Sequence, residues 1–299
     1  MKKILIIGST QSEHLEKLFS NAGYNARAIS DGGTASLAGQ LKYFFKLFPA
    51  LLKTDYLYIV FAQRNNSKNL ILARLLKKKV IMHWIGTDVY QTIHSDKPEI
   101  YTGNIHHICG SKLLHDELKS INISADIIPI LPLKMNMDII KQPEKHSVLI
   151  YLPEGKEDFY GADRIRELAI RNPNIEFHIV ANQGYKPLEL PNVIFHGRLN
   201  SEEMNDMYKN ISILLRIPKH DGLSMMVIEA LAKGKQVLYK YEHPYVYTPK
   251  SLNIDDLDKT FKEIIATEPR ENKKGHDYVA EYYTEKEIMG LYRKYKVFE

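Results

Sequence analysis

Cysteine is nearly absent from this chain of 299 residues. The single one, Cys109, cannot form an intrachain disulfide, which suits a reducing compartment. Long apolar runs are absent too. No stretch reaches the roughly 18 apolar residues of a spanning helix. The apolar run at 4–7 is too short for a signal peptide, and no small-residue cleavage site follows, so a buried first strand and a cytoplasmic protein are expected.

Signatures of several protein classes are missing. There is no zinc-finger spacing and no RNA-recognition motif, so nucleic acid is not an expected partner. The twelve histidines include no His-Glu-x-x-His, and we expect no metal site. Asp256-Leu257-Asp258 matches the Asp-x-Asp of metal-dependent transferases, but it lies at an expected helix start, where capping explains it better. No Gly-x-Ser-x-Gly elbow is present, and Gly8-Ser9-Thr10 is not a dinucleotide-binding glycine motif.

Charge is unevenly placed along the chain. Residues 1–145 carry 19 Lys and Arg against 12 Asp and Glu, whereas residues 146–299 carry 22 against 24. A basic half and a near-neutral half indicate two domains with different partners. The basic half suits an anionic membrane or a phosphorylated substrate.

Short apolar runs alternate with amphipathic stretches in both halves, which predicts an α/β fold of parallel βαβ units. We expect strands at 4–7, 56–62, 80–84, 105–109, 126–131, 148–152, 175–181, 192–196, 211–216 and 236–240. Helices are expected at 13–22, 70–76, 112–119, 163–171, 201–209, 223–233, 257–267 and 277–298.

The stretch 130–144 interrupts this alternation with prolines and no clear period, so we interpret it as a linker. The sequence thus predicts two Rossmann-like domains, 1–140 and 141–280, and a C-terminal helix at 281–299 that can pack back on the first domain. Ligands of such folds bind at the carboxyl ends of the strands, in a cleft that two facing domains would share.

The most informative segment is 214–234, where a strand ends at Arg216 and a helix begins near Leu223 after a polar turn. The helix N-terminus after Gly222, around Leu223 and Ser224, is suited to bind an anion, and Arg216 and Lys219 add positive charge for a diphosphate. Glu229 lies in an apolar, Ala-rich stretch, where a carboxylate needs hydrogen-bonding partners such as sugar or ribose hydroxyls. Asp221 precedes it by eight positions, on the turn.

This segment resembles the signature of the retaining, nucleotide-sugar-dependent glycosyltransferases of family 4, which have the two-domain GT-B fold. Asp221, Gly222, Glu229-Ala230 and Gly234 match its two acids and its glycines, with Asp in place of the usual first Glu. The resemblance implies that Glu229 holds the ribose and that Asp221 contacts the donor sugar. On their own, the residues also allow Asp221 as a helix cap and Glu229 as a solvated side chain.

Two further stretches of the second half follow the same family order. Gly155-Lys156 and Tyr160-Gly161 resemble its phosphate-binding elements, with Lys156 where Arg is usual and Tyr160 where Lys is usual. His196-Gly197-Arg198-Leu199 resembles the turn whose backbone faces the donor base, which implies a donor-binding role for Gly197. The likeness covers nearly all of residues 148–240.

The first half matches more loosely. The run from His83 to Asp88 resembles the His-x-x-Gly-Thr-Asp segment of these acceptor domains, so His83 and Asp88 are candidates near the reacting centre. A core histidine and a helix cap are the alternatives. Gly8, Ser9 and Thr10 after the first strand, and Arg64 after another strand, are candidate acceptor-binding residues.

Residues 37–53 combine four aromatic side chains with Lys42, Lys46 and Lys53. Such a helix either packs on the core with a solvated basic side or lies on an anionic membrane. Lys77-Lys78-Lys79 extends the basic character. If both face one surface, a lipid-linked acceptor becomes an option, and the protein would contact the inner face of the membrane peripherally.

Together these features predict a transferase that moves a sugar from a nucleoside-diphosphate sugar to a hydroxyl of a glycan, a lipid-linked saccharide or a protein. The resemblance implies retention of configuration, no metal and no other cofactor, and a role in making a surface polysaccharide, glycolipid or glycoprotein. Asp221 joins His83 and Asp88 as a candidate catalytic residue. Two alternatives stay open: a nucleotide-sugar epimerase on the same fold, and an inactive nucleotide-sugar-binding partner of a transferase complex.

Overall fold

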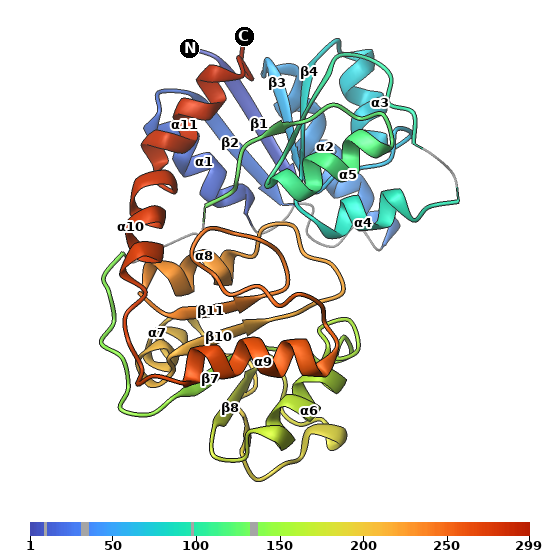
Figure 1. The fold of residues 1–299 in the computed structure, drawn as a ribbon. Helices are drawn as coiled ribbons and strands as arrows, with labels where there is room; N and C mark the ends of the chain where they lie inside the picture. The colour runs from blue at the N-terminus through green and yellow to red at the C-terminus, as the bar shows by residue number, and fades with distance from the viewer. Residues whose placement is uncertain (9–10, 31–35, 97–98, 132–136) are drawn as a thin grey trace. The chain divides into compact units, whose positions relative to one another are not determined.

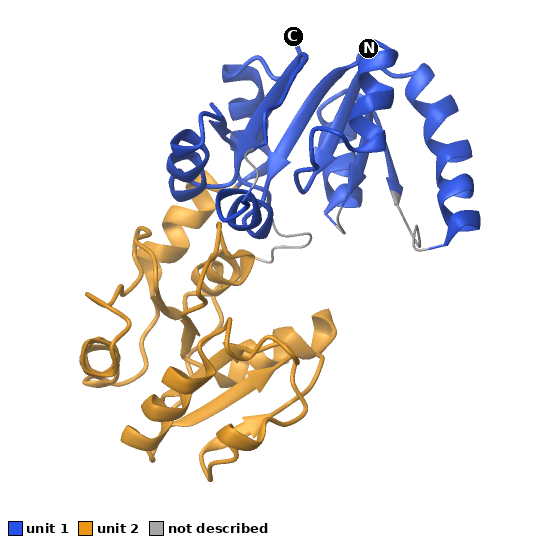
Figure 2. Ribbon diagram, turned by 90° about the vertical axis from the view of Figure 1, so that its right-hand side faces the viewer, with its two compact units in different colours: residues 1–133, 284–299 blue, residues 134–283 orange. Residues whose placement is uncertain are grey.

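The computed structural model describes residues 1–8, 11–30, 36–96, 99–131 and 137–299. The chain divides into two compact units (Figure 2). Unit 1 consists of residues 1–133 and 284–299, and unit 2 of residues 134–283. Both are α/β with one parallel sheet, as the alternation of the sequence predicts.

The sheet of unit 1 has the order β2-β1-β3-β4-β5-β6, and every pair of neighbouring strands is parallel. β1 and β3 are buried on both faces, which explains their continuous apolar runs. Leu57 and Ile59 of β3 join the core cluster beneath one set of helices, whereas Tyr56 and Tyr58 point to the opposite face. The strands are β1 (Lys3–Gly8), β2 (Asn25–Ser30), β3 (Tyr56–Val60), β4 (Lys79–Trp84), β5 (Ile105–Cys109) and β6 (Asp126–Ile127).

Helices cover both faces of this sheet (Figure 1). Buried residues of α2, α3 and α5 belong to the core cluster on one face. On the other face, α11 runs beside α1, where the rings of Phe19 and Tyr292 meet at 5.1 Å between centroids. The helices of unit 1 are α1 (Ser12–Asn21), α2 (Leu37–Leu52), α3 (Lys68–Leu75), α4 (Thr87–Ile93), α5 (Lys112–Ser120) and α11 (Glu285–Lys294).

Unit 2 has a parallel sheet of order β11-β10-β7-β8-β9. Its main core cluster joins the sheet to α6 and α9. The strands are β7 (Ser147–Tyr151), β8 (Glu176–Val180), β9 (Val193–Phe195), β10 (Ile213–Arg216) and β11 (Gln236–Tyr239). The helices are α6 (Ala162–Arg171), a 3-10 turn (Lys186–Leu188), α7 (Ser201–Asn210), α8 (Met225–Ala232), α9 (Ile254–Ile265) and α10 (Lys273–Tyr282).

Most predicted elements are present, and the differences have local causes. The strand expected at 126–131 ends at Ile127, since Pro129 cannot donate a ladder hydrogen bond. The long C-terminal helix is two helices, because the Thr284 side chain caps a new one by accepting from the amide of Glu287. β2 and α4 are additional: β2 is an edge strand in which exposed and half-buried residues alternate without an apolar run, and α4 has seven residues. Among the described residues, no helix is both long and apolar enough to span a bilayer.

Candidate functional site

The strand order of unit 2 reverses beside β7: β8 and β9 extend the sheet on one side, and β10 and β11 on the other. In doubly wound sheets, ligands bind at the carboxyl ends of the strands at such a switch point. β7 ends at Tyr151 and the neighbouring β10 ends at Arg216. These two residues and the loops that follow them, 152–161 and 217–224, therefore form the candidate donor site.

Arg216 is held on three sides at this point. Its Nε donates to Oδ2 of Asp221 at 2.8 Å, and both side chains are largely buried. Its guanidinium lies 5.2 Å from the ring centre of Tyr160 and 5.6 Å from that of Tyr151. Two aromatic faces and a carboxylate thus fix the cation, and the cation in turn orients Asp221.

The guanidinium of Arg216 stays charged although it is buried. Burial opposes the charged form, but Asp221, together with Tyr160 and Tyr239, raises the pKa of Arg216 above its ordinary value. Arg216 and Asp221 therefore carry opposite charges that largely cancel. Asp221, on the loop that follows Arg216, thus neutralises much of the positive charge that was expected to face a ligand.

The other two expected cations lie nearer to solvent. Lys219 pairs with Asp158 of the preceding loop, and its amide donates to the carbonyl of Phe159 at 2.7 Å. Lys156 is exposed on the same loop. Gly161 has a φ of +81°, and a Cβ there would lie 3.0 Å from the carbonyl oxygen of Ile217, so glycine lets the two loops meet.

Glu229 lies on α8 and is half-buried. Burial raises the pKa of its carboxyl, while the Lys233 ammonium and the Tyr208 hydroxyl beside it work in the opposite direction. Lys233 also lies over the Tyr208 ring, 5.3 Å from its centre. Glu229 is therefore a partly buried carboxylate on an apolar helix, where further hydrogen-bond donors would stabilise it.

The helix α8 begins two residues later than the sequence predicts. Ser224 is its N-cap, and the carbonyl of Ser224 accepts from the amides of Val227 and Ile228. Gly222 and Ser224 are buried and Leu223 is half-buried. The positive end of this helix dipole therefore lies at the carboxyl edge of the sheet, which favours an anion.

Gly197 lies in a turn that pairs with the segment after β8. Its φ is +66°, its amide donates to the carbonyl of Asn182 at 2.9 Å, and its own carbonyl accepts from Ala181. Asn182 is fully buried and donates to Glu157 at 3.0 Å. The loops after β7, β8 and β9 are thus linked through Glu157, Asn182 and Gly197.

Unit 1 has its own switch point between β1 and β3. Gly8 ends β1 with a φ of +125°, and a Cβ there would lie 2.0 Å from the carbonyl oxygen of Val60. Only glycine fits this position, which leaves a close turn at the carboxyl edge. The neighbouring candidates Ser9 and Thr10 lie outside the described residues.

His83 is fully buried within β4. Its Nδ1 lies 2.7 Å from the Tyr58 hydroxyl, which in turn lies 2.5 Å from the Tyr292 hydroxyl. Burial lowers the pKa of His83 to about 3, against a smaller opposing contribution from the backbone of Ile128. The imidazole is therefore neutral at physiological pH and points to the face of the sheet that α11 covers.

Asp88 is also buried, in the first turn of α4. Its carboxylate accepts from the amides of Ala62, Ile85, Gly86 and Val89 at 2.7 to 3.0 Å. It therefore ties the loop after β3 to the loop after β4. Burial raises its pKa, although these amides work in the opposite direction.

Arg64 belongs to the loop after β3, and its side chain is exposed. Its Nε lies 4.0 Å from Oε1 of Glu99, whose other carboxylate oxygen accepts from the amide of Asn65. The guanidinium is therefore available to a ligand at the carboxyl edge of unit 1.

Within the described part of the chain, no group of three or more His, Cys, Asp or Glu side chains is placed to hold a metal ion. The Asp-x-Asp match lies in the first turns of α9: the amide of Asp256 donates to the capping Asn253 side chain, and Asp258 pairs with Lys262. These contacts agree with capping at this helix start.

No protein-family model and no curated protein sequence matches this chain. Solved structures do. Sucrose-phosphate synthase from Thermosynechococcus elongatus matches with a TM-score of 0.69 and 12% identity over 100% of both chains. The lipopolysaccharide outer core galactosyltransferase WaaB matches with a TM-score of 0.68 and 14% identity over 98% of both. The fold is that of GT-B glycosyltransferases.

The same fold also matches a protein assigned as a UDP-N-acetylglucosamine 2-epimerase from Listeria monocytogenes. The TM-score is 0.53 and the identity 10%, over 94% of this chain and 91% of that one. At these identities the likeness is one of fold, and the residues of the site have to carry the function.

The sequence indicated the main anchors of the candidate donor site but not their partners. Tyr151 and Tyr160 enclose Arg216, yet Tyr151 was no candidate and Tyr160 was noted only where the family usually has Lys. The signal available was position alone: Tyr151 ends the strand that neighbours β10. Tyr208 and Lys233 around Glu229 come from two helices, and only Lys233 has a readable spacing, one turn after Glu229.

Proposed function

We propose that this protein is a glycosyltransferase that moves a sugar from a nucleoside-diphosphate sugar to a hydroxyl acceptor. The observation that carries the proposal is the charged cluster of Arg216 and Asp221 at the switch point of unit 2, on a fold shared with glycosyltransferases. Half-buried Glu229, on the helix that starts from the same loop, completes the site. The family resemblance of this segment adds retention of configuration and independence of a metal ion.

Each residue of unit 2 has a role in this proposal. Glu229 accepts hydrogen bonds from the ribose hydroxyls. These bonds replace hydrogen bonds to water that the carboxylate loses through its partial burial. Asp221, oriented by Arg216, accepts from hydroxyls of the donor sugar. Lys156, Lys219 and the start of α8 at Gly222, Leu223 and Ser224 stabilise the negative charge that develops on the leaving diphosphate, and Gly197 faces the base.

Unit 1 binds the acceptor in this proposal. Gly8 and Arg64 lie at the carboxyl edge of its sheet, and Ser9 and Thr10, which follow Gly8 in the sequence, are the other proposed acceptor-binding residues. His83 and Asp88 act as positioning residues, because both are buried in hydrogen-bond networks that fix strands and loops. Acceptors of this kind belong to the synthesis of polysaccharides, glycolipids or glycoproteins, and a cytoplasmic enzyme would meet them at the membrane or in solution.

A donor panel tests the proposal. The protein is incubated with UDP-, GDP-, CMP- and ADP-linked sugars, with and without EDTA, and with simple glycoside acceptors, and the products are separated by mass and NMR. We expect one donor to release its nucleotide and to give a glycoside with the same anomeric configuration as the sugar in the donor. EDTA should not change the rate. Loss of turnover on adding EDTA would contradict metal independence.

An epimerase is the second candidate, because one structure of similar fold is assigned to that class. An epimerase converts the nucleotide sugar without an acceptor, so a new nucleotide sugar formed from donor alone would replace the transferase proposal. An inactive, donor-binding partner subunit is the third, because Arg216 and Lys219 are both already paired. That alternative predicts nucleotide binding without any product.

A further inference from the structure

An apolar stripe on α2 faces away from the core of unit 1. Leu47 and Leu51 of α2 are buried in the core. Six large apolar side chains of the same helix, at helical spacing, are exposed: Leu37, Leu41, Phe44, Phe45, Phe48 and Leu52. The neighbouring α3 exposes Ile71 and Leu75. Eight of the fifteen exposed large apolar side chains among the described residues thus lie on two adjacent helices, and such a cluster marks a binding surface.

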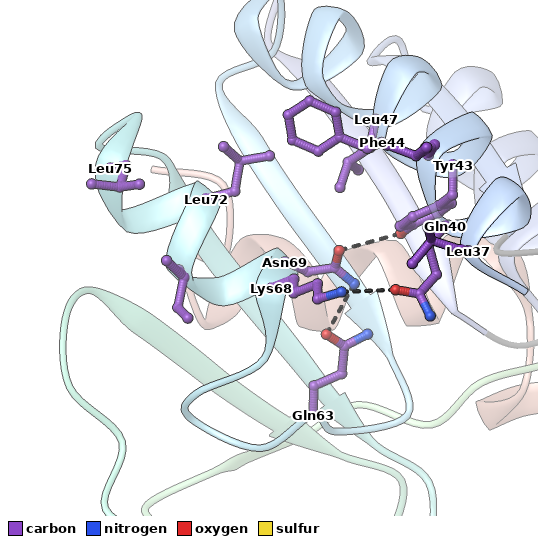
Figure 3. Close-up of a pocket in the computed structure, with 12 residues that line it drawn as sticks. Leu37, Gln40, Tyr43, Phe44, Leu47, Gln63, Lys68, Asn69, Leu72 and Leu75 are labelled. Atoms are coloured by element: carbon purple, nitrogen blue, oxygen red, sulfur yellow. Dashed lines mark hydrogen bonds between the residues drawn. The ribbon is translucent and has the colours of Figure 1, made fainter. Parts of the chain in front are cut away.

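Five of these side chains, Leu37, Leu41, Phe44, Ile71 and Leu75, line a groove between α2 and α3 with a volume of about 820 Å³ (Figure 3). Leu41, Phe44 and Leu47 line it from α2, and Ile71, Leu72 and Leu75 from α3. We call it the α2–α3 groove. Figure 3 shows Phe44, Leu47, Leu72 and Leu75 around its apolar part. A narrow apolar groove of this kind fits a hydrocarbon chain.

One end of the α2–α3 groove is polar. Lys68 Nζ donates to Oε1 of Gln40 at 2.8 Å, and Asn69 Nδ2 donates to Oε1 of Gln63 at 3.1 Å (Figure 3). Gln63 follows β3, and α2 and α3 both begin at this end. The polar end therefore lies at the carboxyl edge of the sheet, next to the candidate acceptor residue Arg64. The groove has the arrangement of an amphiphile site: a head at the functional edge and a chain along the helices.

The charge around the α2–α3 groove has one sign. Residues 37–53 and 67–79 contain eight Lys and Arg and no Asp or Glu. Lys68 lines the groove itself, and Lys42 on α2 and Lys77 after α3 are exposed. Lys46 and Lys53 are exposed at a separate hollow of α2 beside Phe45. Long lysine side chains can lie along apolar surface and keep their ammonium groups at the level of lipid phosphates. This combination complements an anionic lipid surface.

We propose that the acceptor is an anionic membrane lipid whose hydrocarbon chain occupies the α2–α3 groove. Its polar head lies at Gln40, Gln63, Lys68 and Asn69, within reach of the carboxyl edge of unit 1. The assignment of this lipid as the acceptor rests on the proposed function. A protein partner would need acidic side chains to match this surface, and a second copy of this chain would bring like charges together.

Calorimetric titration with oleoyl-lysophosphatidylglycerol, a single-chain anionic lipid used below its micelle concentration, tests the groove. Leu75→Glu and Leu41→Glu place a charge on its exposed rim and should weaken binding about tenfold or more. Ile71→Trp fills the groove without adding charge and should weaken binding too. Ile100→Glu is the matched control, since Ile100 is 73% exposed and Leu75 is 74% exposed, and should bind like the wild type.

Flotation with vesicles tests the surface charge. Vesicles of phosphatidylcholine and phosphatidylglycerol should carry the wild type but not Leu75→Glu, and vesicles of phosphatidylcholine alone should carry much less of either. Absence of lipid binding by the wild type, or equal binding by the groove variants, would overturn the proposal. So would a dimer in light scattering that Leu75→Glu abolishes, because the groove would then join two copies.

Nucleotide titrations separate failure of this inference from failure of the proposed function. Leu75→Glu should bind the donor nucleotide like the wild type, because the donor site lies in unit 2. Transfer to a soluble glycoside that is unaffected by Leu75→Glu, with no transfer to a lipid, would overturn the lipid acceptor and leave the transferase intact. Lipid binding without any nucleotide binding would overturn the transferase, and with it the acceptor role of the lipid.

Discussion

At the scale of single residues, the two acids of the candidate donor site differ in what surrounds them. Asp221 is already satisfied by the Arg216 guanidinium, whereas Glu229 has Tyr208 and Lys233 beside it and is disfavoured as an anion by burial. Asp221 is thus fixed before any ligand arrives. Glu229 gains more from new hydrogen-bond donors, so it is the better reporter of nucleotide binding.

His83 gives a pH prediction at the same scale. Its folded pKa of about 3 lies below the usual 6.5, so the unfolded chain takes up a proton below about pH 6.5 that the folded chain does not. The free energy of unfolding of the wild type should therefore decrease as the pH is lowered below about 6.5. This residue alone contributes up to ~1.4 kcal/mol per pH unit. His83→Gln removes the titration and keeps a polar partner for Tyr58.

The measurement is denaturant unfolding of both proteins at pH 7 and pH 5. From pH 7 to pH 5, the free energy of unfolding of the wild type should decrease by ~2 kcal/mol relative to that of His83→Gln. Other buried histidines, such as His107, titrate in both proteins, so their contribution cancels in the difference. A difference that does not change with pH would contradict a neutral, buried His83.

At the scale of elements, residues 284–299 complete unit 1. Tyr292 of α11 reaches the Tyr58 hydroxyl, its ring stacks on Phe298 at 5.6 Å, and both rings meet Phe19. Lys79 Nζ donates to the carbonyl of Glu299 at 2.6 Å. The last sixteen residues of the chain therefore cover one face of a sheet built from its first half.

Tyr292→Ala should destabilise unit 1 by ~3–5 kcal/mol, because it leaves a cavity beneath α11 and removes one of the two hydrogen-bond partners of the Tyr58 hydroxyl. Tyr292→Phe keeps the ring and should cost only ~1 kcal/mol. Chemical unfolding followed by circular dichroism measures both. Nucleotide binding by unit 2 should be unaffected, and equal stability of Tyr292→Ala and wild type would show that α11 does not cover this face.

Elements with strong apolar periods could be predicted from the sequence, and contacts between distant segments could not. β1 and β3 were expected because their buried strands are continuous apolar runs. His83 was expected near the reacting centre because it approaches a strand end. Its side chain points to the face that α11 covers, where the Tyr58 hydroxyl links it to Tyr292, and no local pattern reports Tyr292, 209 positions later.

The candidate site was predictable to the same degree. Arg216, Asp221 and Glu229 could be located because a strand, a turn and a helix follow each other within 14 residues. Their charge state could not, since the rings of Tyr151 and Tyr160 and the carboxylate of Asp221 come together only in the folded sheet. A helix cap was the alternative for Asp88, and its four amide partners, from the loops after β3 and β4 and from α4 itself, depend on the neighbouring strand β3.

At the scale of the whole molecule, the two units carry different surfaces. Unit 1 presents the basic, apolar α2–α3 groove, and unit 2 presents the charged switch point with Glu229. This division matches the unequal charge of the two halves of the sequence. It suits an enzyme that takes a soluble nucleotide sugar on one unit and a membrane lipid on the other.

Calorimetric titration of UDP, GDP, CMP and ADP into the wild type and Glu229→Gln, with EDTA present, tests the central claim most directly. The account predicts that one nucleotide binds the wild type with one site per chain. It also predicts that Glu229→Gln, folded as judged by circular dichroism, binds that nucleotide at least about tenfold more weakly, as the loss of a charged hydrogen-bond acceptor requires. Equal affinity of the two proteins, or no binding of any nucleotide, would contradict a donor site in unit 2.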